Sequence, residues 1–392
     1  MVFLLCDKSE RAIFMYKRNI YIMYMLSLLQ GMVFYAPVAT LYRQAQGVTI
    51  FQITVIESIS LALCMAMELP WGMIADRIGY KKTMLFCNVL YFISKVVFWK
   101  ADGFGGFLIE RIMLSIVCAG LSGVDSSILY LSCEEGESQK VFSVYEGLGT
   151  VGLLTTAVVY SMFIGDHYRL AGFLTVFSYG LAMILSFGLL EVKKKEQKRE
   201  SAKDFVALFK EICRNKQLFL FLLAVALFHE VHQTITVFLS QLQYVRAGIS
   251  NSMMGILYGL ITVVGLSSFL SDRITKKTGE ENTIRFCFLF AFLSCAILMV
   301  SDRAVLSVLA IVLIRLAFSI FQPLQMELQN RQVMTRDRAT ALSVNAVFID
   351  SIGIFANILF GALAEYSLMA AFAFGVAACG IGYVLLEIWK KN

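Results

Sequence analysis

The feature that most constrains this chain is a series of long apolar blocks that recurs from Ile20 almost to the C-terminal residue. At 1.5 Å per residue, a helix of about 20 residues crosses a hydrocarbon core of ~30 Å. A membrane span must satisfy its backbone hydrogen bonds internally, so such blocks predict helices. The expected spans are residues 20–42, 50–75, 82–100, 105–131, 140–164, 169–190, 217–241, 250–271, 283–300, 304–328, 339–364 and 367–389.

Composition excludes most soluble proteins. Apolar residues make up 58% of the 392 residues and charged residues 16%, with a mean hydropathy of +0.73. A soluble domain of this size needs more polar surface to cover itself. The sequence also contains no P-loop, no G-x-G-x-x-G motif after a strand and no nucleophile triad. We therefore predict an all-α membrane protein that is not an enzyme and has no cofactor.

Basic residues give the orientation. With both termini in the cytoplasm, the cytoplasmic segments hold 26 of the 34 Lys and Arg residues. The outer segments hold Arg43, Lys100, Arg169, Arg246 and Arg303, and three more lie within predicted helices (Lys95, Arg111 and Arg315). This asymmetry follows the positive-inside rule. The net charge of +6 thus reflects membrane orientation rather than nucleic-acid binding.

Neither disulfides nor a metal site are expected. The nine cysteines are scattered and form no CxxC pair. His229 and His232 are three residues apart, which differs from the H-E-x-x-H zinc motif. The charged N-terminal stretch also argues against a cleavable signal peptide.

A polar stretch divides the chain into two six-helix bundles. We expect an N-terminal bundle over residues 1–190, a cytoplasmic linker with one amphipathic helix over 191–216, and a C-terminal bundle over 217–392. A short repeat supports two parallel halves. Asp76, Arg77 and Ile78 recur as Asp272, Arg273 and Ile274, which is an offset of 196 residues.

The loop after the second predicted helix resembles the G-x-x-x-D-R-x-G-R-K-K motif of the major facilitator superfamily. It matches at Gly72, Asp76, Arg77, Gly79, Lys81 and Lys82, while Tyr80 replaces a basic residue. The resemblance covers the whole chain and implies the twelve-helix fold of that superfamily. It also implies a gate at the cytoplasmic side, in which Arg77 can pair with Glu146, and in which Asp272 and Arg273 form the second copy. The alternative is a plain positive-inside topology signal.

Shorter segments resemble a bacterial branch of drug:proton antiporters that includes macrolide exporters. These are Glu68 to Gly72 (E-x-P-x-G), Ser122 to Ser126 (S-G-x-D-S) and Arg338 to Ser343 (R-A-T-x-L-S). The fifth helix departs from the antiporter pattern, since Gly147, Gly149 and Gly152 are present but the proline and the paired glycines are missing.

Ionisable residues inside predicted spans are the candidate binding residues, because each costs roughly 2.5–3.5 kcal/mol on insertion scales. Glu230, on a helix that lines the cavity in the superfamily, can exchange protons or contact substrate, as can His229 and His232; the alternative is interhelical hydrogen bonding. Arg315 and Asp350 are read either as a buried structural ion pair or as a functional pair.

Further candidates lie in the first half. Asp125, beside the small residues Ser122 and Gly123, is expected in a packed interface, either in a local network or on the proton path. Arg111 is a cavity residue by resemblance. Glu57 and Lys95 either reach the interface or pair with each other. Aromatic and polar side chains of the first helix are expected on the cavity wall, namely Tyr24, Gln30, Phe34 and Tyr35.

Together these features predict a monomeric, proton-coupled exporter of amphipathic or cationic small molecules in a bacterial-type cytoplasmic membrane. It would work by alternating access around a midplane site. Proton-coupled import of a specific metabolite, lipid flipping and a non-transporting receptor are the alternatives.

Overall fold

The computed structural model describes residues 2–134, 136–192, 215–332 and 338–391, and the statements below concern these residues. Every regular element among them is helical. Twelve helical segments are long and apolar enough to cross a membrane, from Lys17–Ala45 to Leu368–Lys391. The prediction of an all-α membrane protein with twelve spans is confirmed. The amphipathic helix expected in the linker falls mostly on residues outside the described ranges.

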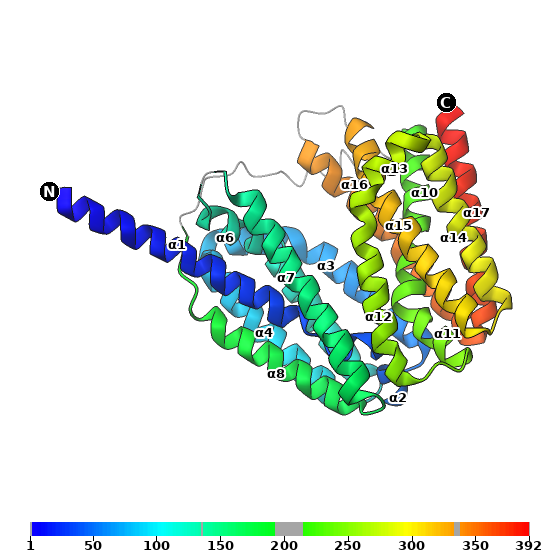
Figure 1. The fold of residues 1–392 in the computed structure, drawn as a ribbon, viewed down its shortest axis with the longest axis horizontal. Coiled ribbons are helices and arrows are strands. Elements are labelled where there is room, and N and C mark those ends of the chain that lie inside the picture. Colours follow the sequence, from blue (N-terminus) through cyan, green and yellow to red (C-terminus); the bar gives the residue numbers. More distant parts are fainter. Residues whose placement is uncertain (1, 135, 193–214, 333–337, 392) are drawn as a thin grey trace. The chain divides into compact units, whose positions relative to one another are not determined.

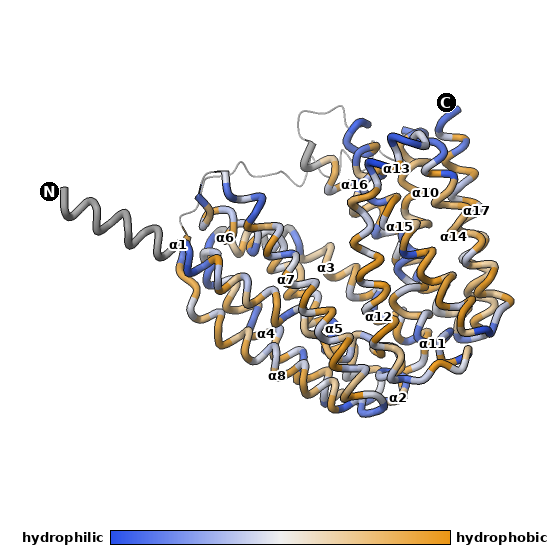
Figure 2. Tube along the Cα trace, in the orientation of Figure 1, coloured by the Kyte–Doolittle hydropathy of each residue, from blue (hydrophilic) through white to orange (hydrophobic). Residues whose placement is uncertain are grey.

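The chain forms two compact units. The first contains Met1–Pro37 and Ser60–Glu196. Apolar side chains of its helices pack into a core that includes Met23, Leu26 and Leu129. Its helices (Figure 1; α5 is labelled in Figure 2) are α1 (Val2–Gly31), the second part of α3 (Ile50–Ile78), α4 (Tyr80–Lys100), α5 (Gly103–Leu121), α6 (Val124–Ser132), α7 (Ser138–Val159), which continues in the π-helical segment η2 (Tyr160–Ile164), and α8 (Tyr168–Ser186).

The second unit contains Val38–Ile59 and Gln197–Asn392. The segment 38–59, assigned by the sequence to the first bundle, thus packs with the second half of the chain. The helices are α2 (Ala39–Ala45), the start of α3, α10 (Lys216–Gln233), the π-helical segment η3 (Thr234–Leu239), α11 (Ser240–Arg246), α12 (Asn251–Gly265), α13 (Ser271–Thr278), α14 (Glu280–Val300), α15 (Ala304–Gln332), α16 (Arg338–Tyr366) and α17 (Leu368–Lys391). Figure 2 shows apolar residues along these helices and hydrophilic ones near their ends.

The two halves repeat with an offset of 200 residues, so the offset of 196 predicted from the sequence is wrong by one helical turn. Helix α4 (80–100) corresponds to α14 (280–300), and α7 and α8 begin 200 residues before α16 and α17. The buried positions of α5 at Phe107, Glu110 and Leu114 recur on α15 as Ser307, Ala310 and Ile314. The Asp-Arg-Ile match therefore joins residues that lie one turn apart in the folded repeat.

Two glycines set this register. Gly79 precedes α4 with a φ of 93°, and Gly279 precedes α14 with a φ of 83°. A residue with a Cβ rarely adopts this conformation. In both halves the threonine four residues later (Thr83 or Thr283) donates its hydroxyl to the glycine carbonyl, over 2.9 and 2.8 Å. Matching conformations and hydrogen bonds identify the two glycines as equivalent.

Glycines also let α1 and α7 approach closely. A Cβ on Gly152 would lie 3.0 Å from the Gly31 Cα and would overlap the Leu28 carbonyl oxygen. A Cβ on Gly149 would lie 3.1 Å from the hydroxyl of Ser27. That hydroxyl donates to the Tyr145 carbonyl over 2.7 Å. The small residues of the fifth helix therefore pack it against the first, which is the usual role of such residues between membrane helices.

Adding one methyl group at Gly152 is expected to destabilise the protein by about 1–3 kcal/mol, because the contacted atoms belong to the α1 backbone. Gly147→Ala on the same helix is the matched control, since a Cβ there meets no atom within 4 Å. Thermal unfolding in detergent should show a lower Tm for Gly152→Ala only. Equal midpoints for the two variants would contradict this packing.

The fourth predicted span is not one continuous helix. It breaks between α5 and α6 at Ser122 and Gly123, where Gly123 has a φ of 77°. Both residues are exposed, and a Cβ on Gly123 would meet nothing within 4 Å. The expected packed interface at these small residues is therefore wrong: the glycine is needed for its backbone conformation.

Candidate functional site

Glu230 on α10 is a buried carboxylate that no basic side chain of the described residues neutralises. Its side chain lies among α10, η3 and α16, and the residue is 6% exposed. Thr234 donates its hydroxyl to Oε1 over 2.5 Å, and a Cβ on Gly353 would come within 3.1 Å of Oε2. Among the described residues, no basic side chain forms an ion pair with it, and the Thr234 hydroxyl is its hydrogen-bond donor. In a bilayer such surroundings favour the protonated carboxyl group.

A second cluster joins α10 to α15. Arg315 Nη1 donates to His232 Nε2 over 3.1 Å, so this imidazole nitrogen is unprotonated and the ring is neutral. The ring of His232 stacks on Phe318, with 3.8 Å between centroids and 4° between planes. His229 meets the same phenyl ring edge-on at 5.5 Å. The sequence thus predicted Arg315, His232 and His229 as candidates, and the structure brings the two histidines onto the ring of Phe318.

The predicted ion pair between Arg315 and Asp350 is absent among the described residues. Arg315 bonds to His232, and its other electrostatic neighbour is Tyr258 on α12. Arg315 therefore belongs to the cluster of His232.

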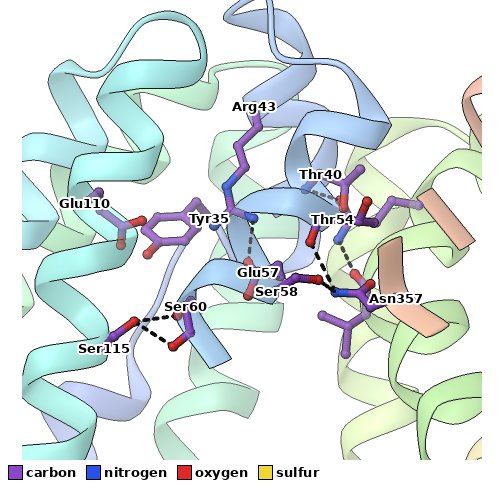
Figure 3. Close-up of polar contacts among 12 residues, drawn as sticks. Tyr35, Thr40, Arg43, Thr54, Glu57, Ser58, Ser60, Glu110, Ser115 and Asn357 are labelled. Atoms are coloured by element: carbon purple, nitrogen blue, oxygen red, sulfur yellow. Dashed lines mark hydrogen bonds and ion pairs between the residues drawn. The ribbon is translucent and has the colours of Figure 1, made fainter. Parts of the chain in front are cut away.

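Side chains of the segment 38–59 form further polar contacts within the second unit (Figure 3). Arg43 and Glu57 form a buried ion pair at 3.5 Å. The Asn357 amide donates to the carbonyl of Thr54 and to the hydroxyl of Ser58, each over 3.4 Å. Sequence reasoning missed Asn357; the signal was an amide in the middle of an apolar span.

A third cluster lies in the first unit, and the sequence analysis named its Lys95 and Tyr35 but missed Glu110. Lys95 on α4 is 3% exposed, and its ammonium lies 3.6 Å from Oε1 of the fully buried Glu110 on α5. It donates to the Tyr35 hydroxyl over 2.9 Å and lies 5.1 and 5.3 Å from the ring centroids of Tyr91 and Tyr179. A cation at this distance from aromatic rings is attracted to them. The expected pairing of Lys95 with Glu57 is therefore wrong, since each has another partner.

The predicted cavity-wall residues of the first helix serve mainly as contacts within the first unit. Phe34 is buried, and its backbone N–H donates to Thr175. Tyr35 stacks on Phe98 at 3.8 Å, and Gln30 donates to Asn88 over 2.6 Å. Tyr24 is partly buried and meets the ring of Tyr21 edge-on.

Two further candidates lie on α5 and α6. Arg111 on α5 is partly exposed, and its carbonyl accepts a hydrogen bond from the hydroxyl of Ser115. Asp125 lies in the first turn of α6 and accepts the Ser126 backbone N–H over 2.6 Å, which stabilises the start of that helix. Its carboxylate thus has a local capping role, and a role on the proton path stays a prediction.

The gating motif is described in part, since the side chain of Asp76 and the surroundings of Gly72 fall outside the described positions. At Gly79 a Cβ would come within 2.9 Å of the Glu191 carboxylate, which also accepts the Lys81 backbone N–H over 3.3 Å. Glu191 therefore caps α4, which explains why glycine is needed for space as well as for φ.

The remaining gating residues lie at the surface of their units. Arg77, Lys82 and Glu146 are exposed, and Arg77 and Glu146 form no ion pair with each other. In the second copy Asp272 binds Lys276 over 2.8 Å, and Arg273 is exposed. Over the described ranges no group of three His, Cys, Asp or Glu side chains is arranged to hold a metal ion.

The comparisons with known proteins agree on one fold. The sequence matches the family model of the Major Facilitator Superfamily over residues 20–357. No curated protein matches the chain. The nucleoside transporter NupG is 16% identical with a TM-score of 0.77, covering 96% of this chain and 98% of that one.

Two further solved structures share the fold. A bacterial homologue of the human lysosomal transporter Spinster, inward-facing, is 17% identical with a TM-score of 0.68, covering 96% of this chain and 95% of that one. A POT family transporter in complex with 5-aminolevulinic acid is 13% identical with a TM-score of 0.69 and the same coverage. At these identities the likeness concerns the fold alone.

Proposed function

This chain belongs to the Major Facilitator Superfamily, and we propose that it is a proton-coupled exporter of amphipathic small molecules. It exchanges protons for substrate across a bacterial-type cytoplasmic membrane, with both termini in the cytoplasm. The two halves alternate in opening the substrate site to either side. Glu230 is the group that takes up and releases the proton.

The surroundings of Glu230 carry this proposal. A carboxylate inside a membrane span is costly when ionised, so it is neutral unless a cation or several donors stabilise its charge. Here one hydroxyl donates to it, and no basic side chain of the described residues forms an ion pair with this buried carboxylate. A nearby change in hydration or substrate occupancy can then move its proton, which is what coupling requires.

Proton-coupled uptake of a specific metabolite is the second candidate. The fifth helix lacks the proline and the paired glycines of the antiporter pattern, which favours uptake. The glycines that it does have, Gly149 and Gly152, pack against α1. Solved structures with the same fold bear the names of a nucleoside transporter and a peptide transporter. Uptake moves substrate and proton in the same direction, whereas export moves them in opposite directions. The two candidates therefore predict opposite signs for the pH change that accompanies substrate entry.

Proteoliposomes with a pH dye in the lumen distinguish the candidates. Taurocholate, tetraphenylphosphonium or uridine is added outside, and the lumenal pH is followed against protein-free liposomes. Antiport predicts that an entering amphipathic probe drives protons out, which makes the lumen alkaline. Acidification by uridine supports uptake instead. A lumenal pH that no probe changes beyond the protein-free control would count against proton coupling.

A further inference from the structure

Arg315 is a charged side chain near the middle of the membrane-spanning helix α15, and no carboxylate of the described residues pairs with it. Its hydrogen-bond partner is His232, which is neutral and leaves the positive charge uncompensated. An arginine in a bilayer span is normally paired with an acid or with carbonyl oxygens. Arg315 is partly exposed, and no anionic side chain of the described residues balances its charge.

The cluster has unfilled hydrogen-bond donors as well as charge. Because Nε2 of His232 accepts from Arg315, its proton lies on Nδ1, and this atom is buried without a partner. Arg315 Nε is likewise buried without a partner. Residue His232 is 3% exposed, so water does not readily replace the missing acceptor. A buried donor left unsatisfied costs about 1–3 kcal/mol, which an incoming acceptor would recover.

Gly265 leaves space for the side chain of Arg315, and the equivalent position of the first half holds no arginine. The guanidinium lies against Gly265 of α12, where a Cβ would come within 2.9 Å of both Cζ and Nε. At the repeat offset of 200 the first half has Ser115, whose hydroxyl bonds to backbone carbonyls. The positive charge is thus present in the second half alone of these two equivalent positions, and the missing side chain of Gly265 leaves space for the guanidinium.

From these observations we infer that Arg315 and His232 bind an anionic group of the transported molecule, a carboxylate, sulfonate or phosphate. Phe318, stacked on His232, supplies an adjoining apolar surface, so the substrate class is an amphipathic anion. Guanidinium groups bind such anions through paired, charge-assisted hydrogen bonds. This inference rests on the proposed transport function and narrows its substrate. Glu230, which has its own partner Thr234, is left to the proton.

Two dyes with the same xanthene core and opposite charge test the inference: fluorescein is an anion and rhodamine 6G is a cation. Equilibrium binding is measured by fluorescence anisotropy with the full chain in phosphatidylcholine nanodiscs. Arg315→Gln is expected to weaken fluorescein binding about tenfold or more, as for the loss of a charged hydrogen bond. Binding of rhodamine 6G should be unchanged or tighter.

Two further variants separate lost binding from lost folding. Arg315→Lys keeps the charge but not the fork of donors, so intermediate fluorescein affinity is expected. Gly265→Ala pushes the flexible guanidinium aside and should weaken fluorescein binding while retaining the wild-type Tm. Fluorescein affinity unchanged in both Arg315→Gln and Gly265→Ala would overturn the inference.

The binding assay needs no pH gradient, so its result does not depend on whether the protein couples transport to protons. If Arg315→Gln loses fluorescein binding but no probe moves protons, the anion subsite stands and proton coupling is wrong. If protons move but wild type binds rhodamine 6G more tightly than fluorescein, proton coupling stands and the anionic substrate class is wrong.

Discussion

A Glu230→Gln variant is expected to fold and to exchange substrate across the membrane, yet to lose proton-driven flux by about a hundredfold, the usual weight of a positioned proton-transfer group. Glutamine keeps the shape of a protonated glutamic acid and can still accept from Thr234. It cannot release a proton, so the coupled cycle is blocked at this step. Exchange at equal pH on both sides should persist, because it needs no net proton movement.

The measurement compares flux in proteoliposomes with and without an imposed pH gradient. Glu387→Gln is the matched control, because it makes the same substitution near the C-terminal end of the second unit. Glu387 forms a partly solvent-exposed ion pair with Arg285. It should retain both activities. Full proton-driven flux in Glu230→Gln would remove this residue from the coupling mechanism and leave Asp350 as the next carboxylate to test.

The second large effect concerns the stability of the first unit. Lys95→Ala is expected to lower the free energy of unfolding by about 3–5 kcal/mol, because it leaves the carboxylate of Glu110 buried without its cation. Neither oxygen of Glu110 has a hydrogen-bond partner among the described residues, so the ion pair with Lys95 is its compensation. The variant also removes the contacts of the ammonium with the three tyrosine rings.

The double variant Lys95→Met with Glu110→Leu should recover most of this loss, since apolar replacements of a buried pair are often neutral or stabilising. Unfolding of wild type, Lys95→Met, Glu110→Leu and the double variant in detergent completes a double-mutant cycle. A coupling energy near zero would contradict the pairing. Transport by a stable double variant would establish that the cluster serves the fold.

The number of membrane spans and their helical type followed from the sequence. A bilayer demands helices of a minimum length, and each apolar block meets that demand by its own composition, whatever its neighbours are. The same holds for the candidate residues: Glu230, His232 and Arg315 stand out because charge or polarity within an apolar block needs a partner. No tertiary information enters either argument, and both identified real features of the fold.

The partners of these residues were decided by the tertiary structure. Lys95 is paired with Glu110 rather than Glu57, and Arg315 with His232 rather than Asp350, because helix rotation and neighbour choice depend on packing along the whole helix. The repeat register was likewise fixed by Gly79 and Gly279, whose backbone conformation outweighs the Asp-Arg-Ile likeness. Sequence determines what each helix must bury, whereas close packing between helices determines which groups meet.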